Sequence, residues 1–294
     1  MKKKVSLMII VILIMQVLLP MLTVMWESNF TLMSKAAETK EATVDGITWV
    51  YELDSDNNAI NVKPKDINSL PPEVTIPSKL DNYNVKSIGH AAFYNCEGII
   101  SINIPESVTN IEGYAFKKCI NLESINISGS ISTIGNETFN NCTSLTSIII
   151  PESVTNIGNW AFSDCKSLVS INIPERVESI GEYAFCNCVG ITSINIPNNV
   201  VSIGKDAFNG CKNIKSITIP KSVENIGEFA FLNCNSLTSI NVDNNNSYYC
   251  SIDGVLYNKN KTEIISYPIK KERNRVYNTR NCNKYRRTCI SLLY

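Results

Sequence analysis

Seven cysteines in this 294-residue sequence recur at every 23rd position. They are Cys96, Cys119, Cys142, Cys165, Cys188, Cys211 and Cys234. One thiol per interval does not suit a metal site, which takes its cysteines in close pairs such as C-x-x-C. Disulfides between successive thiols are compatible with the spacing if the Cα atoms come within about 4.4 to 6.8 Å. Because these cysteines keep phase with Phe and Leu, the pattern favours buried, unpaired thiols that pack as small apolar groups.

Catalytic patterns are missing from the sequence. The only histidine is His90, so chemistry that needs two imidazoles is excluded. The sequence has no Gly-x-Ser-x-Gly, no glycine-rich phosphate loop and no His-Glu-x-x-His. Carboxylates such as Glu106, Glu123 and Asp206 fall at changing positions, so no carboxylate pair is fixed. The sequence therefore predicts a protein that is not an enzyme and uses no cofactor or metal.

The cysteines belong to a longer repeat with the same 23-residue period, and this repeat must position their side chains. Counted from each Cys, Leu or Ile stands at +3, Ile at +6, Ile or Val at +8, and usually Pro at +9. Val or Ile follows at +12 and Ile at +15, then usually Gly at +16, Ala at +19 and Phe at +20. The alternation at +6 and +8 predicts a short strand with one buried face, and Pro would end it. Gly suits a tight turn, and Ala-Phe-x-x-Cys fits a short helical or 3₁₀ turn that buries Phe and Cys. A 23-residue unit is too short to bury its own apolar face. Successive units, which we call coils, must therefore stack on one another as a solenoid.

The alternation also predicts one candidate binding surface. Strand residues at +5 and +7 point to solvent on the concave face, while those at +6 and +8 point inward. The outward residues are Ser101, Asn103, Ser124, Asn126, Ser147, Ser170, Asn172, Ser193, Asn195, Ser216, Thr218, Ser239 and Asn241, with Ile149 interrupting the series. This ladder of hydroxyls and amides could bind an extracellular protein or a glycan. Alternatively, Ser and Asn are simply tolerated exposed residues, because the strip lacks the aromatic or Arg anchors of most protein interfaces.

The repeat as written, "IPESVTNIGNWAFSDCKSLVSIN", resembles the BspA-type (treponemal-type) leucine-rich repeat, found in surface proteins. The match covers 73–242, about seven coils, and five extra residues around 81–84 resemble the family's first-coil insertion. The resemblance implies a leucine-rich repeat solenoid of α/β type. One short parallel strand per coil would lie on the concave face and short helical or 3₁₀ turns on the convex face. It also implies adhesion to host matrix proteins, host cells or other microbes.

Both flanks of the repeats are expected to be β structure. Residues 37–72 predict an N-terminal β cap, with two strands around the polar turn at 54–58. A cap is needed there because the first coil would otherwise expose its core edge. Residues 243–269 predict a β-hairpin, with strands "GVLY" and "EIISYP" around the turn "NKNK".

The N-terminus predicts export. Lys2, Lys3 and Lys4 precede an apolar run over 5–25, and Ser34 and Ala36 are small residues of the kind read by a signal peptidase. Residues 1–36 are therefore a signal peptide cleaved near Ala36, or alternatively an uncleaved anchor. Either predicts a secreted or cell-surface protein, which would contact a membrane through this segment only if the segment stays uncleaved.

The charges divide the chain into unlike parts. Residues 1–36 carry four Lys and one Glu, and 270–294 carry eight basic residues and one Glu. Since the whole chain has 27 basic and 27 acidic residues, 37–269 hold 15 basic and 25 acidic ones, a net charge of −10. This acidic body is unsuited to a basic nucleic-acid interface.

The basic tail, 270–294, does not continue the repeat. Back-translated from Arg273 to Ser291 and shifted by one base, permissible codons read "EIEYTIPETVTNIEEPAF", which restores Ile-Pro and Ala-Phe in phase. This predicts a frameshifted, disordered tail on a truncated repeat protein. The alternative is a genuine cationic tail that rests on an anionic wall or membrane.

Together these features predict a monomeric, non-catalytic binding scaffold at the cell surface or secreted from the cell. Two alternatives stay open. The repeats could be the substrate-targeting arm of a larger secreted or wall-associated enzyme, or the chain could be a non-functional truncated copy.

Overall fold

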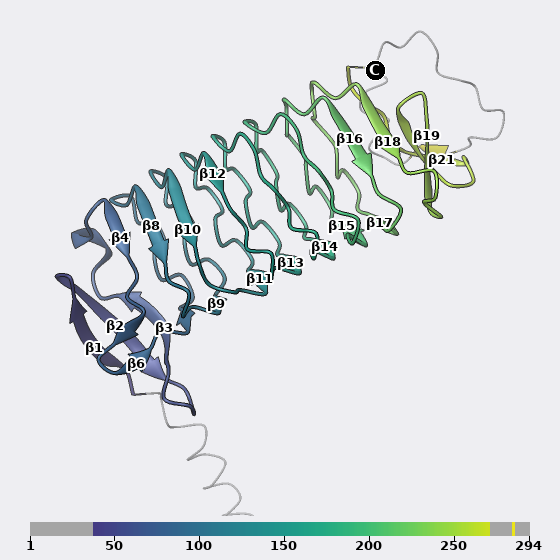
Figure 1. The fold of residues 1–294 in the computed structure, drawn as a ribbon. Coiled ribbons are helices and arrows are strands. Elements are labelled where there is room, and N and C mark those ends of the chain that lie inside the picture. The colour runs from purple at the N-terminus through teal and green to yellow at the C-terminus, as the bar shows by residue number, and fades with distance from the viewer. Residues whose placement is uncertain (1–37, 271–283, 286–294) are drawn as a thin grey trace, which may run out of the picture. The chain divides into compact units, whose positions relative to one another are not determined.

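The computed structural model describes residues 38–270 and 284–285 (Figure 1). The predicted signal segment 1–36 lies outside the described residues. The tail, with its predicted frameshift and disorder, also lies outside them except for Lys270 and a two-residue strand, β22 (Lys284–Tyr285).

The repeats form a solenoid in which successive coils pair in parallel, as the repeat pattern predicted (Figure 1). Its first set of strands comprises β4 (Glu73–Thr75), β8 (Ser101–Ile104), β10 (Ser124–Ile127), β12 (Ser147–Ile148), β16 (Ser216–Ile219) and β18 (Ser239–Val242). Four of them form the sheet β12-β10-β8-β4, and β16 pairs with β18. We call this surface, which was predicted to be concave, the strand face.

Two coils depart from the prediction of one strand per coil. Residues 170–173 and 193–196 keep the exposed-buried alternation of the strand face. They form no regular strand, and a single bridge joins Ile149 to Asn172. The path of the chain is thus maintained by burial of the inward Ile side chains even where the backbone ladder is interrupted.

A second set of short strands, not predicted from the sequence, lies at positions +14 and +15. It comprises β7 (Ser87–Ile88), β9 (Asn110–Ile111), β11 (Thr133–Ile134), β13 (Asn156–Ile157), β14 (Ser179–Ile180), β15 (Ser202–Ile203) and β17 (Asn225–Ile226). They pair in parallel in the orders β7-β9 and β11-β13-β14-β15-β17. In each strand the second residue is a buried Ile, so this row closes the core opposite the strand face.

The segment from +16 to the next Cys forms a hydrogen-bonded turn rather than a helix, and we call the surface made by these turns the turn face. The turns are 89–96, 112–119, 135–142, 158–165, 181–188, 204–211 and 227–234. Within turn 181–188, the N–H groups of Ala184, Cys186 and Cys188 each donate to the carbonyl three residues earlier. Residues +18 and +22 have positive φ throughout, for example 59° at Trp160 and 60° at Asp164. A left-handed residue every four positions stops a helix from propagating, and the only regular helix in the described part is the 3₁₀ turn η1 (Ile67–Ser69).

Phenylalanine rings at +20 form a continuous stack through the core. The stack comprises Phe93, Phe116, Phe139, Phe162, Phe185, Phe208 and Phe231. Neighbouring centroids are 5.2–5.9 Å apart and all seven rings are buried. The ring planes are within 17° of parallel, so each coil presents the same apolar surface to the next.

Glycine at +16 serves close packing between coils, not the tight turn expected from the sequence. A Cβ on Gly204 would lie 2.5 Å from backbone atoms of Gly181 and Glu182, and one on Gly227 would lie 2.3 Å from the backbone nitrogen of Lys205. The φ angles at these two glycines are not positive. At these two positions a side chain would therefore force adjacent coils apart, although Glu112 occupies the same position in an earlier coil.

A β cap covers the first coil, as predicted, with one more strand than expected. Strands β1 (Lys40–Val44), β2 (Ile47–Leu53) and β3 (Ala59–Pro64) are antiparallel, and β3 pairs in parallel with β7. Trp49 is 1% exposed and meets Phe93 edge-on at 6.3 Å, which closes the open end of the ring stack. The first-coil insertion forms the small hairpin β5 (Lys79–Leu80) and β6 (Tyr83–Asn84).

The predicted hairpin follows the last coil. Strands β20 (Val255–Asn258) and β21 (Glu263–Ser266) are its two arms, and an additional strand, β19 (Tyr249–Ile252), pairs with β20. The short strand β22 pairs in parallel with β21. Leu256 and Ile265 reach the main hydrophobic core, so this unit covers part of the last coil.

A search of the described residues for a helix long and apolar enough to cross a membrane found none, and the apolar run 5–25 lies outside them.

Candidate functional site

The structure places the thirteen predicted binding residues in one row along the strand face. Their side chains alternate with buried Ile, as in β10, where Ser124 and Asn126 are exposed and Ile125 and Ile127 are buried. Ser101 and Ser239 are half-buried. The others are exposed: Asn103, Ser124, Asn126, Ser147, Ser170, Asn172, Ser193, Asn195, Ser216, Thr218 and Asn241. The sequence pattern thus predicted which side chains of the strand face point outward.

Neighbouring amides on this surface bind one another. The Nδ2 group of Asn126 donates to Oδ1 of Asn103 at 2.7 Å and to the hydroxyl of Ser128 at 3.2 Å. Such bonds orient the amides while each keeps further donor or acceptor capacity for solvent or a ligand. The surface is uncharged, so it is suited to hydrogen-bonding partners rather than to ion pairs.

A shallow hollow of about 340 Å³ marks the N-terminal end of the strand face. It is lined by Glu73, Val74, Thr75, Ser101, Ile102, Asn103, Ser124, Ile125 and Asn126. Four of the thirteen predicted residues meet here. Glu73 and Thr75 were missed because the first coil precedes the first Cys of the series. Glu73 pairs with Ser101 and Thr75 with Asn103, which are 28 residues apart instead of 23. The same spacing separates the Ile-Pro dipeptide at 76–77 from the one at 104–105, so the sequence does contain a signal for this pairing.

One apolar spot interrupts the polar strip. Ile149 occupies an outward position and is 80% exposed. Val169, one residue before Ser170, is 55% exposed. Two apolar side chains near the middle of the strip give a partner a place to bury surface that the surrounding Ser and Asn residues do not provide.

The turn face carries aromatic residues at +18. Trp160 stacks on Tyr183 with 4.0 Å between centroids and 10° between planes, and Trp160 remains 38% exposed. The Tyr183 hydroxyl donates to Asp206, and this bond together with burial raises the pKa of Tyr183. The pair covers the edge of the two turns 158–165 and 181–188.

The cysteine series is a column of buried, unpaired thiols. Each of six thiols donates to the carbonyl of the Phe one coil back, as Cys119 does to Phe93 at 3.0 Å and Cys165 does to Phe139 at 3.1 Å. Burial raises the pKa of Cys142 and of Cys234 to about 12. A thiol that is buried, bonded and neutral at physiological pH is a packing group, not a nucleophile.

No group of three or more His, Cys, Asp or Glu side chains is placed to hold a metal ion in the described part of the chain. The ring of His90 lies 4.9 Å from that of Tyr114, at the edge of the first turns.

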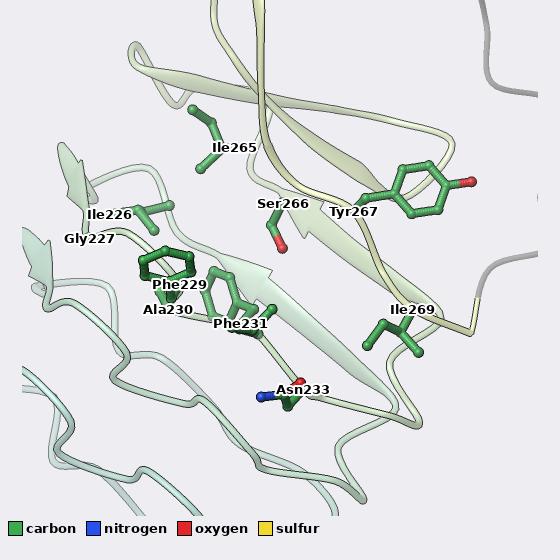
Figure 2. A pocket seen from close by; sticks show the side chains of 11 residues that line it. Ile226, Gly227, Phe229, Ala230, Phe231, Asn233, Ile265, Ser266, Tyr267 and Ile269 are labelled. Carbon is green, nitrogen blue, oxygen red and sulfur yellow. The ribbon is translucent and has the colours of Figure 1, made fainter. Parts of the chain in front are cut away.

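A second hollow lies at the C-terminal end of the solenoid, between turn 227–234 and the strand β21 with the residues that follow it (Figure 2). Phe229 and Phe231 lie on one side of it, and Ile265 and Ile269 on the other. Sequence reasoning did not identify this hollow, because it depends on how the hairpin sits against the last coil.

The solved structures most informative for comparison are bacterial leucine-rich repeat proteins. A leucine-rich cell surface protein from Faecalibacterium prausnitzii is 31% identical with a TM-score of 0.71, over 80% of this chain and 63% of that one. The chain thus spans about three fifths of the length of that relative. The leucine-rich repeat protein of Treponema pallidum is 30% identical with a TM-score of 0.61, over 67% of this chain and 90% of that one.

The pneumococcal vaccine antigen PcpA is 22% identical with a TM-score of 0.52, over 79% of this chain and 57% of that one, and it shows the shared fold alone. A search of curated proteins gave no match. The family described as BspA type leucine rich repeat region matches in six copies, over 72–191 and 156–284. With more than half of its length matched, this chain belongs to the BspA-type leucine-rich repeat family.

Proposed function

We propose that the chain is a secreted or cell-surface, non-catalytic scaffold whose strand face binds an extracellular protein or glycan, with adhesion as its role. The observation that carries the proposal is the row of exposed Ser and Asn side chains, which ends in the hollow beside Glu73. Solenoid proteins commonly bind extended partners on such a face. The relative from F. prausnitzii is described as a cell surface protein, and the apolar segment 5–25 supports export of this chain.

The surface chemistry favours a partner that forms hydrogen bonds. The strip is uncharged and the body around it is acidic, which disfavours nucleic acid. Ile149 and Val169 supply apolar contact near its middle. A protein partner that covers several coils would be positioned by hydrogen bonds to the amides. Burial of Ile149 and Val169 would supply much of the binding free energy.

The test immobilises the full chain and measures binding of soluble host matrix proteins by surface plasmon resonance. The variant Asn126→Arg puts a bulky charge into the hollow, and we expect it to weaken binding by roughly tenfold or more because a buried unpaired charge opposes association. Val201→Arg is the matched control, since Val201 is 39% exposed and lies away from the strip. Equal binding by both variants, or no binding above a repeat-scrambled chain, contradicts the proposal.

A further inference from the structure

The last turn, 227–234, differs from the six turns before it in its backbone hydrogen bonds. Each earlier turn donates three N–H groups to carbonyls of the next turn, at 2.7–3.2 Å. In turn 204–211 the donors are Asp206, Phe208 and Gly210, and the acceptors are Glu228, Ala230 and Leu232 in turn 227–234. The corresponding donors of turn 227–234 are the N–H groups of Phe229, Phe231 and Asn233. None of these three has an acceptor among the described residues.

Bonds within this turn are also fewer. Turn 204–211 closes with bonds from Ala207 to Gly204 and from Cys211 to Phe208. The equivalent bonds, from Ala230 to Gly227 and from Cys234 to Phe231, are absent in the described structure. Of the three bonds that close turn 204–211, turn 227–234 thus keeps only the equivalent of the one from Asn209 to Asp206, which is the bond from Leu232 to Phe229.

The hairpin covers this edge with side chains and leaves the donors unbonded. Figure 2 shows Ile265 and Ile269 across the hollow from the turn. Ile265 is buried in the main core, and the N–H of Lys270 donates to the carbonyl of Leu237 at 3.2 Å. The ring of Phe231 has Phe208 on one side and, among the described residues, no further ring stacked on the other. Phe231 is buried, Phe229 is half-buried and Asn233 is exposed. A backbone N–H with no acceptor in the protein is left to water or to a partner, so the edge favours a partner that supplies carbonyls.

The edge presents donors only, which restricts the partner. The carbonyls of Glu228, Ala230 and Leu232 already accept bonds from the preceding turn. A second copy of the same edge would therefore bring donors against donors. The other end of the solenoid is closed by the cap, where Trp49 covers Phe93 and Ile67 accepts a bond from the Cys96 thiol. Neither end of a second copy fits.

We propose that turn 227–234 is a docking edge for one further coil of the same repeat, presented by another polypeptide. Such a coil offers carbonyls at +17, +19 and +21 to the three free N–H groups and a Phe at +20 to stack on Phe231. The contact continues the interface that already joins six pairs of turns in this chain. The incoming turn enters the hollow, and the residues 265–269 move outward to admit it. This site is distinct from the strand face, so it does not depend on the proposed adhesive role.

Amide hydrogen exchange on the full chain tests the proposal, with a synthetic peptide of residues 151–173 as the probe. In the free chain we expect the N–H groups of Phe229 and Phe231 to exchange roughly tenfold or more faster than that of Phe208, which is bonded to Ala230. Excess peptide should slow exchange at Phe229, Phe231 and Asn233 by about fivefold or more, and leave Phe208 unchanged. A peptide with Ser at the position of Phe162 is the matched control, because it keeps the carbonyls but loses the stacking ring.

A short peptide can fail to form its turn in solution, so a second arm joins the same peptide segment to Tyr294 through a flexible Gly/Ser linker. The linker raises the effective concentration of the coil at the edge. Slowed exchange in this fusion, lost in the Phe-to-Ser version, supports the proposal. The proposal is overturned if the three N–H groups are already as protected as Phe208 in the free chain, or if neither arm slows their exchange.

Discussion

The turn face and the strand face are built from the same repeat but hold the coils together to different degrees. On the turn face, each of the first six turns is joined to the next by three backbone bonds, and stacked rings lie beneath them. On the strand face, regular pairing is interrupted at 170–173 and 193–196 although the side chains keep their alternation. Cohesion between coils is therefore concentrated at the turns and in the core, which leaves the strand face free to vary its outward side chains.

Removal of one ring from the stack should have the largest effect. Phe162→Ala deletes a fully buried ring between Phe139 and Phe185, and we expect a loss of about 3 to 5 kcal/mol in the free energy of unfolding. Trp160→Ala, two residues earlier on the same turn, should cost about 1 kcal/mol or less because Trp160 is 38% exposed. Urea unfolding followed by circular dichroism measures both. Equal losses would mean that the exposed aromatic pair carries as much cohesion as the core stack.

Separation of two turns should come next. Gly204→Ala places a Cβ 2.5 Å from the backbone of turn 181–188, and we expect a loss of about 1 to 3 kcal/mol. Gly98→Ala is the matched control, because its nearest neighbour would be the Leu70 carbonyl at 3.8 Å, an ordinary contact. We expect that control to stay within about 0.5 kcal/mol of the parent in the same urea experiment. A tolerated Gly204→Ala would contradict the role of close backbone approach.

Alkaline pH should weaken the core through its thiols. Burial raises the pKa of Cys142 to about 12, whereas an unfolded thiol ionises near pH 8.5. Above the unfolded pKa the folded chain holds a proton that the unfolded chain releases. The stabilisation is thus complete below about pH 8.5 and is lost as the pH rises toward 12.

The slope reaches about 1.4 kcal/mol per pH unit for each such thiol. Urea midpoints between pH 8 and pH 11 measure it. Cys142→Ser should lower the total slope by up to about 1.4 kcal/mol per pH unit while the other buried thiols keep theirs, and Cys250→Ser should change it less because Cys250 is only half-buried. A larger effect of Cys250→Ser would show that the buried column does not control the response.

The smallest effects are expected on the strand face. Ser147→Ala and Asn172→Ala remove exposed side chains, and each should change stability by about 0.5 kcal/mol or less. Thermal unfolding monitored by circular dichroism is sufficient to detect a larger change. A loss several times greater than this would show that the polar ladder itself holds the coils together, and the contrast between the two faces would disappear.

The period and the alternation of the sequence were sufficient to predict the stacked coils, the buried Phe and Cys columns and the outward Ser and Asn residues. These features depend only on which side chains must leave water, so a single coil carries the information. The cap and the hairpin were also predicted from alternating apolar residues around polar turns, although β1 and β19 were missed.

Backbone details could not be predicted in the same way. Residues 124–127 and 193–196 have the same sequence, Ser-Ile-Asn-Ile, yet only the first forms a regular strand. The difference must therefore come from neighbouring coils. The left-handed turn residues were equally hidden, because Trp160 and Tyr183 are types that rarely adopt positive φ. Stacking and bonds to adjacent turns hold them there, and these are tertiary effects.

The constant register has a consequence for how such a chain can change. In the parallel pairs beyond the first coil, residue i faces residue i+23, as Ile157 faces Ile180 and Ser216 faces Ser239. Duplication or deletion of one whole repeat therefore brings the same side chains together again and needs no new core. The strand face can be lengthened or shortened in steps near the ring spacing of 5.4 Å between Phe162 and Phe185. Recombination between repeats thus resizes the molecule by whole coils, whereas an insertion of one residue within a repeat would disturb the contacts on both sides.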